Sequence, residues 1–114
     1  MTINEYQEKA HTFANYNEGY KEPAFNNFIY PVMNLAGECG EVCGKFAKVY
    51  RDEQGHFSEE SFRLIKKELG DICWFVAELC TCLGVKMEDV MKLNIDKLTD
   101  RFNRGVIGGS GDER

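Results

Sequence analysis

The stretch NLAGECGEVCGKFAK, residues 34–48, has the character of a helix, yet it contains three glycines within eight residues. Each glycine inside a helix costs roughly 0.5–1 kcal/mol relative to alanine. Because these glycines form one stripe, they predict a flat side that another backbone or a ligand can approach closely. Beside the stripe lie two carboxylates, Glu38 and Glu41, followed by Lys45 one turn later. Taken alone, this narrow charged edge fits solvent exposure as well as ligand binding.

Length and charge restrict the class of protein. The chain has 114 residues, 43% of them hydrophobic, which predicts a single globular domain over residues 1–114. Its net charge of −5 argues against binding nucleic-acid polymers or anionic membranes. The amino terminus shows no signal peptide, and no apolar run approaches the roughly 18–20 residues of a membrane helix. We therefore expect a cytoplasmic protein that does not associate with membranes.

The five cysteines are expected to be reduced and buried. Their number is odd and they fall on helical segments, which favours thiols over disulfides in a chain without an export signal. Their spacing also lacks the paired CxxC sets that are typical of structural zinc sites.

Hydrophobic periodicity near 3.6 residues is widespread and strand-like alternation is absent, so the chain is predicted to be helical. A first helix begins at Thr2, which has capping-box spacing to Glu5, and fades within residues 15–23. A second helix runs from Pro31, a favoured first-turn residue, to about Asp52.

Two further helices follow. The third is predicted from a cap at Ser58 to about Cys82, with Phe57 and Phe62 placed as a hydrophobic staple. The fourth covers residues 87–103, and a glycine follows each of these helices. Four helices with short connections predict an all-α, compact four-helix bundle-like domain, completed by oligomerisation.

Helical-wheel positions place carboxylates where apolar side chains are expected. On the third helix Glu68 and Asp71 lie within the apolar arc, whereas the basic side chains face the opposite side. Two unpaired buried carboxylates would cost several kcal/mol each, or would take up protons. A cation held between them removes this cost, so a functional role is favoured over a structural ion pair.

The fourth helix shows the same anomaly with positive charge. Asn94 and Arg101 point toward its apolar side, Lys97 lies at the margin, and the acidic residues face away. These three side chains indicate an anion site. Their positions would also be explained if their polar ends extended to water or formed a salt bridge to the carboxylates.

Together the inward-pointing groups indicate phosphate chemistry with a hard cation. Carboxylate and amide oxygens, without histidine or thiol, favour Mg²⁺, with Mn²⁺ as a substitute. Two divalent ions would neutralise four carboxylates and could clamp a phosphoryl group for in-line attack by water. Lys97 and Arg101 would then hold the outer phosphates, and Lys45 is a further candidate.

Two acidic motifs and a basic run carry a resemblance to a known family. Glu38-x-x-Glu41 is followed by Glu68-x-x-Asp71, and downstream come the run NIDKLTDRFNRG and the tail GVIGGSGDER. This ExxE…ExxD pattern resembles the MazG-like nucleotide pyrophosphohydrolases of the all-α NTP pyrophosphatase superfamily, over roughly residues 31–114.

The resemblance implies that a nucleoside triphosphate, chiefly a dNTP, is cleaved to a monophosphate and pyrophosphate, as in nucleotide-pool house-cleaning. It also implies a homodimer or homotetramer in which neighbouring subunits complete each site. The four carboxylates would be the metal-binding and catalytic residues. The substrate-binding residues would include Asn94, Lys97 and Arg101. Lys45 remains open, since its ammonium could contact phosphate or extend to water.

The region before residue 31 matches the family least. Similar proteins read the base there, and aromatic faces can stack on a base, so His11, Phe25, Phe28 and Tyr30 are candidates, although core or interface positions are favoured for each. Trp74 lies off the apolar arc of the third helix and is expected at a subunit interface.

Two alternatives remain open at this point. A di-iron carboxylate bundle needs two Glu-x-x-His motifs, and Glu8-x-x-His11 is the single match. A non-catalytic helical interaction module is the other alternative, but it gives no reason for carboxylates and Arg101 to point inward.

Overall fold

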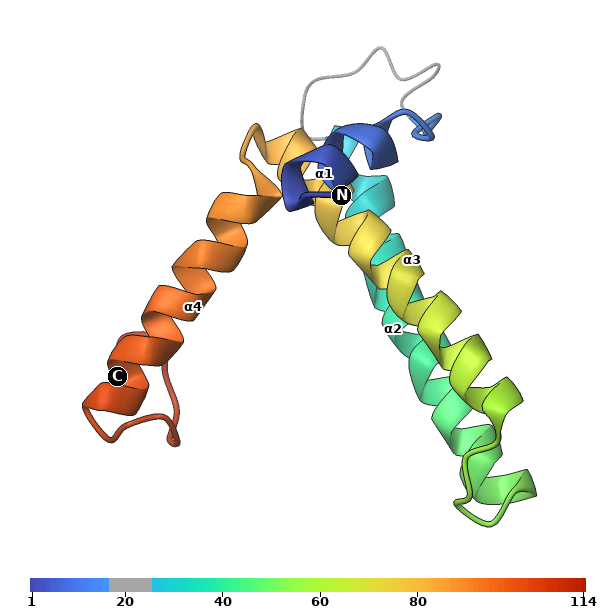
Figure 1. Cartoon of the computed structure of the whole chain (residues 1–114). Coiled ribbons are helices and arrows are strands. Elements are labelled where there is room, and N and C mark those ends of the chain that lie inside the picture. The colour runs from blue at the N-terminus through green and yellow to red at the C-terminus, as the bar shows by residue number, and fades with distance from the viewer. Residues whose placement is uncertain (17–25) are drawn as a thin grey trace.

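A computed structural model describes residues 1–16 and 26–114, and this part of the chain is built from helices alone (Figure 1). The prediction of an all-α chain with four helices is confirmed. No helix in the described ranges combines the length and apolarity needed to cross a membrane. The helices are α1 (Ile3–His11), α2 (Asn26–Asp52), α3 (Glu59–Leu83) and α4 (Met87–Asn103).

The start of α1 is the predicted capping box. The Thr2 hydroxyl accepts a hydrogen bond from the Glu5 amide at 3.1 Å, and the Glu5 carboxylate accepts one from the Thr2 amide at 2.6 Å. The helix ends at His11, earlier than expected. Its last turn closes there because the Thr12 hydroxyl and amide both donate to the carbonyl of Lys9, at 2.7 and 3.1 Å.

The start of α2 differs from the prediction. The helix begins at Asn26, so Pro31 lies inside it. A proline there removes a backbone hydrogen bond, but this ring is fully buried, and its packing offsets the loss. The predicted end at Asp52 is correct, since Gln54 and Gly55 follow with positive φ angles of 54° and 80°.

The bounds of α3 and α4 agree closely with the prediction. The Ser58 hydroxyl accepts from the Ser61 amide at 3.1 Å, and the rings of Phe57 and Phe62 stack with centroids 5.3 Å apart. Gly84 ends α3 with a left-handed φ of 69°, a conformation that favours glycine.

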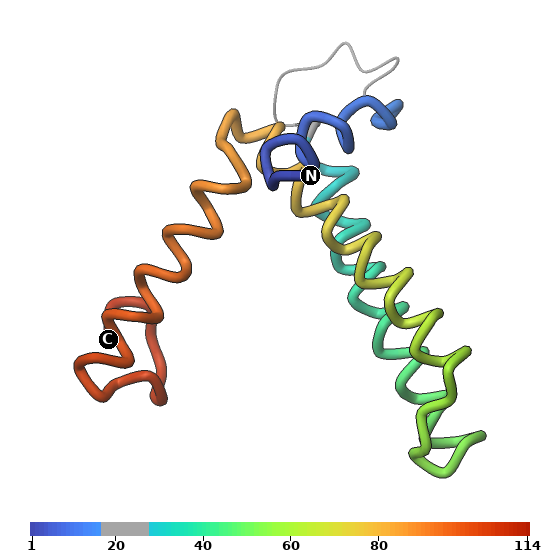
Figure 2. Tube along the Cα trace, in the orientation of Figure 1, coloured from blue at the N-terminus to red at the C-terminus, as the bar shows by residue number. Residues whose placement is uncertain are grey.

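The four helices form an open arrangement (Figures 1 and 2). α2 and α3 lie side by side as a long antiparallel hairpin, α1 crosses one end of α3, and α4 points away from the hairpin. Among the described residues α4 contacts α1 and α3 but not α2. The Cα radius of gyration is 17.4 Å, whereas a compact domain of this length has about 13 Å. A single chain therefore does not close into the compact bundle that we expected.

The core lies where α1 packs on α3 and the start of α4. Trp74 packs against this cluster, and its indole N–H donates to the carbonyl of Ala10 at 3.0 Å. The expected exposure of Trp74 is therefore wrong, because α1 covers part of that side of α3. Its place at a subunit interface stays a prediction. The cluster consists of Ala10, Ala77, Cys80 and Met87, with Tyr6 and Val76 packed beside Trp74.

Many large apolar side chains of α2 and α4 remain exposed in the single chain. Met33 is 68% exposed and Phe102 is 73% exposed. The thiols of Cys39, Cys43, Cys73 and Cys80 form no disulfide, as expected, but the first three are exposed, so their predicted burial is not achieved within one chain.

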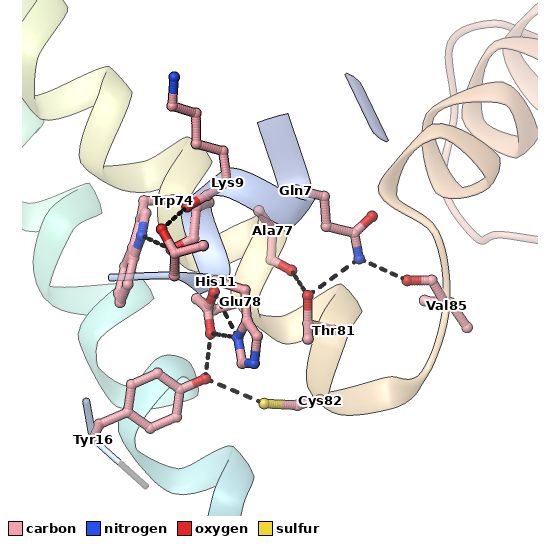
Figure 3. A network of polar contacts seen from close by, with 12 residues as sticks. Gln7, Lys9, His11, Tyr16, Trp74, Ala77, Glu78, Thr81, Cys82 and Val85 are labelled. Carbon is pink, nitrogen blue, oxygen red and sulfur yellow. Dashed lines mark hydrogen bonds and ion pairs between the residues drawn. The ribbon is translucent and has the colours of Figure 1, made fainter. Parts of the chain in front are cut away.

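A buried carboxylate ties α1 to α3 (Figure 3). Glu78 is fully buried, and its carboxylate accepts the Tyr16 hydroxyl at 2.6 Å and lies 3.1 Å from His11 Nδ1. Burial, together with the hydrogen bonds to Cys82 and Glu78, raises the pKa of Tyr16, so its phenol remains a donor. These partners make the burial of the Glu78 charge tolerable.

Gln7, one turn before His11 on α1, joins this helix to the turn before α4 (Figure 3). Its side-chain amide donates to the Thr81 hydroxyl at 3.2 Å and to the Val85 carbonyl at 2.9 Å. Its carbonyl oxygen accepts from the Met87 amide at 2.7 Å. The direction in which α4 leaves the hairpin is therefore fixed in part by α1.

Replacing Glu78 with glutamine should lower the free energy of unfolding by about 1–3 kcal/mol, because the charge-assisted contacts with Tyr16 and His11 are lost. Urea denaturation at neutral pH measures this change. Glu59→Gln is the matched control on the same helix, since Glu59 is exposed, and it should cost about 0.5 kcal/mol or less. Equal losses in the two variants would contradict a stabilising role for this network.

Candidate active site

Three carboxylates meet where α2 and α3 pair. Glu38 comes from α2, and Glu68 and Asp71 come from adjacent turns of α3. Each can offer an oxygen such that these atoms all lie within 4.8 Å of one another. The hairpin thus brings Glu38 of the first acidic motif to both acidic residues of the second.

The cluster is more open than the wheel analysis suggested. Glu38 and Glu68 are partly buried, whereas Asp71 is exposed. The exposure of Asp71 differs from the prediction, which placed it with Glu68 inside the apolar arc of α3. In the single chain, α2 is the helix that covers this part of α3, and α4 does not reach it. The glycine stripe of α2 is also uncovered: a Cβ at Gly37, Gly40 or Gly44 would meet nothing within 4 Å.

Glu41 lies outside the close group and is exposed. Its charge nevertheless acts on the cluster. The pKa of Glu38 is raised first by burial, and then by the charges of Asp71, Glu68 and Glu41. The four predicted carboxylates therefore share one region of negative potential, although three of them form the tight group.

Lys45 provides the one ion pair found with this group among the described residues. Its ammonium Nζ lies 3.3 Å from Oε1 of Glu68, and the two side chains are 23% and 18% exposed. Because both are largely shielded from water, this attraction is screened less than that of a surface pair.

The donor set fits a hard divalent cation. The group contains carboxylates without any thiol or imidazole, which favours Mg²⁺ or Mn²⁺ over zinc or copper. The Glu8-x-x-His11 motif that a di-iron bundle would use is not part of it, because His11 contacts Glu78 instead.

The residues predicted on α4 are not brought to the carboxylates within one chain. Asn94 and Lys97 are exposed, and α4 makes no contact with α2. Arg101 is buried, as its phase predicted, but the chain's own tail covers it: its guanidinium donates to the carbonyls of Gly111 and Asp112.

The candidates for base recognition do not form a pocket beside the cluster. Phe25 lies outside the described residues, and Phe28 is partly buried. The ring of Tyr30 stacks on Tyr16 with centroids 5.0 Å apart, so one of its faces is already occupied. His11 borders a cavity of about 490 Å³ between α1 and the α3–α4 turn, which includes none of the clustered carboxylates.

Sequence reasoning overlooked Glu78, the fully buried carboxylate. A signal was present, because Glu78 follows Asp71 by seven residues and therefore lies on nearly the same face of α3. The position on the helical wheel alone does not distinguish Glu78 from Asp71. Glu78 is enclosed by α1 and Tyr16, whereas Asp71 faces an uncovered side.

In the metal-free chain, the contribution of Glu38 to stability should fall as the pH rises above about 4.5, the ordinary pKa of a glutamic acid, because its pKa is raised in the folded state. Below that pH the group is protonated in both states. Once the pH has passed the folded-state pKa, the folded chain carries a charge that its neighbours disfavour. In EDTA, the denaturation midpoint of Glu38→Gln relative to the wild type should rise between pH 4 and pH 7. Parallel pH profiles would exclude this contribution.

Comparisons with known proteins identify the family of the chain. The model of a family described as the MazG nucleotide pyrophosphohydrolase domain matches residues 31–106, which include both acidic motifs and all of α4. The "Gene 37 protein" of Mycobacterium phage L5 is 38% identical over 114 residues, 100% of each chain. None of the solved structures matches the chain significantly. The resemblance inferred from the ExxE…ExxD pattern is confirmed: the chain belongs to the family of MazG nucleotide pyrophosphohydrolase domains.

Proposed function

We propose that this protein hydrolyses a nucleoside triphosphate, with dNTPs as the substrate class, to a monophosphate and pyrophosphate in a reaction that requires a divalent metal. The observation that carries the proposal is the group formed by Glu38, Glu68 and Asp71 inside a MazG domain. We assign the activity to house-cleaning of the nucleotide pool.

The metal would be held by these three carboxylates, with Glu41 as the fourth ligand or as the base. Bound there, Mg²⁺ would polarise a phosphate group and lower the pKa of a coordinated water. Glu41, one turn after Glu38 on α2, would be the base that accepts the proton of the attacking water. The water oxygen would bond to phosphorus as the P–O bond of the α–β bridge breaks, which releases a monophosphate and pyrophosphate.

The outer phosphates would be held by Asn94, Lys97 and Arg101 of a second copy. Lys97 is exposed in the single chain, whereas Arg101 would exchange the tail carbonyls for phosphate oxygens. A homodimer or homotetramer is supported by the splayed α4, by the exposed apolar side chains and by the exposed thiols of α2.

A pyrophosphate-release assay with each dNTP and Mg²⁺ tests the proposal. Glu68→Gln and Asp71→Asn should each reduce the rate at least about 100-fold, because one metal-binding charge is removed. Circular dichroism should show that both variants keep their helices. Glu60→Gln is the control, since Glu60 is exposed and pairs with Arg63 outside the group.

Three outcomes would change the assignment. Absence of pyrophosphate with every nucleotide would favour the non-catalytic interaction module. Orthophosphate in its place would indicate a phosphohydrolase. Near-normal rates in both variants would contradict the assignment of the metal site.

The apolar face of α4 should be required for the oligomer. Leu98 is 38% exposed on this face, and Leu98→Glu should shift the protein to a smaller species, because a charge would be buried in the interface. Sedimentation velocity measures the change. Thr99→Glu, at the exposed neighbouring position, is the matched control and should leave the assembly intact. A monomeric wild type, or an unchanged Leu98→Glu assembly, would argue against this interface.

A further inference from the structure

We propose that Lys45 serves as an internal counter-ion of the metal-free carboxylate cluster, and that binding of a divalent ion displaces its ammonium group from Glu68 toward a substrate phosphate. The inference rests on the proposed metal-dependent function. It assigns Lys45 a role in both states of the site, since the same charge stabilises the metal-free chain and, once released, contacts the nucleotide.

The geometry of the contact between Lys45 and Glu68 supports the counter-ion role in the metal-free chain. Lys45 Nζ lies 3.3 Å from Oε1 of Glu68, and Glu68 also contributes an oxygen to the close carboxylate group. A cation bound by that group would share this carboxylate with the ammonium, and the two positive charges would repel each other at close range. Binding of the ion would therefore weaken the contact between Lys45 and Glu68.

Charge determines the direction of the exchange. The group formed by Glu38, Glu68 and Asp71 carries three negative charges within a few ångströms, and a single ammonium neutralises one of them. A divalent ion supplies twice that charge and can touch several carboxylates at once. After it binds, the net negative charge that attracts Lys45 falls from three to one, so the ammonium is held less strongly.

The position of Lys45 on α2 supports the proposed movement of its ammonium group toward a substrate phosphate. It lies seven residues after Glu38 and four after Glu41, on the same face of the helix as both. Its flexible four-carbon stem lets the ammonium move by several ångströms without any change in the helix. A nucleotide whose phosphates approach the cluster would therefore come within its reach.

Lys48 offers a matched control one turn further along α2. Its side chain is exposed, and its charge acts on Asp52 at the end of the helix rather than on the carboxylate group. Lys45→Met and Lys48→Met remove the same charge and keep a similar stem, so their difference isolates the contact with Glu68. Lys45→Arg keeps the charge and tests whether it is sufficient.

The experiment is a titration of Mn²⁺ into wild type, Lys45→Met and Lys48→Met without nucleotide, with free Mn²⁺ followed by electron paramagnetic resonance. Lys45→Met should bind Mn²⁺ about three- to ten-fold more tightly than wild type, and Lys48→Met should differ by less than about two-fold. In EDTA, the midpoint of thermal unfolding should be a few degrees lower for Lys45→Met alone, and Mn²⁺ should restore it.

Steady-state kinetics at saturating metal test the phosphate contact. Lys45→Met should raise KM for the nucleotide at least several-fold while kcat changes less, and Lys45→Arg should recover most of the loss. Equal Mn²⁺ affinity in the two methionine variants would overturn the counter-ion role. Tighter Mn²⁺ binding with an unchanged KM would overturn the transfer to phosphate. A wild type that binds no Mn²⁺ would defeat the proposed function itself, and this inference with it.

Discussion

The pairing of α2 with α3 places like charges against one another, and the rest of the structure depends on this constraint. Glu38 faces Glu68 and Asp71 across the hairpin, so their carboxylates repel in the absence of a cation. Burial and these neighbours raise the pKa of Glu38, and the single ammonium of Lys45 offsets part of the charge. Stability alone gives no reason for this arrangement, since like charges held close together oppose folding. The hairpin instead retains an arrangement that becomes favourable when a hard cation binds.

The remaining elements anchor the hairpin at one end and leave it open on its sides. α1 is joined to α3 through the buried carboxylate of Glu78 and to the start of α4 through Gln7, so hydrogen bonds hold these three helices together (Figure 3). α4 then extends away from α2, and its apolar side chains stay exposed. The basic residues on α4 and the carboxylates therefore lie apart in one chain. A second copy that covers α2 and α4 would bring both halves of a phosphate site together, and it would remove apolar surface from water at the same time.

Local signals in the sequence were sufficient for most of the helix bounds and for the acidic site. The caps at Thr2 and Ser58 act within a few residues, so they could be read directly. The start of α2 was predicted wrongly at Pro31. The cost of a proline inside a helix is offset here by its burial, which only the tertiary structure reveals. Trp74 and Arg101 show the same limit. The wheel placed Trp74 off the apolar arc of its own helix, yet α1 packs on it, and it did not show that the tail covers Arg101. For this reason Glu78 was also missed, although it shares the face of Asp71.

The most direct test of the carboxylate site is the anomalous scattering of Mn²⁺ in crystals of the protein soaked with the metal. Our account predicts an anomalous peak between α2 and α3, within bonding distance of Glu38, Glu68 and Asp71, with the Lys45 ammonium no longer in contact with Glu68. Well-ordered carboxylates with no peak between them at saturating Mn²⁺, or a peak at other residues alone, would contradict it.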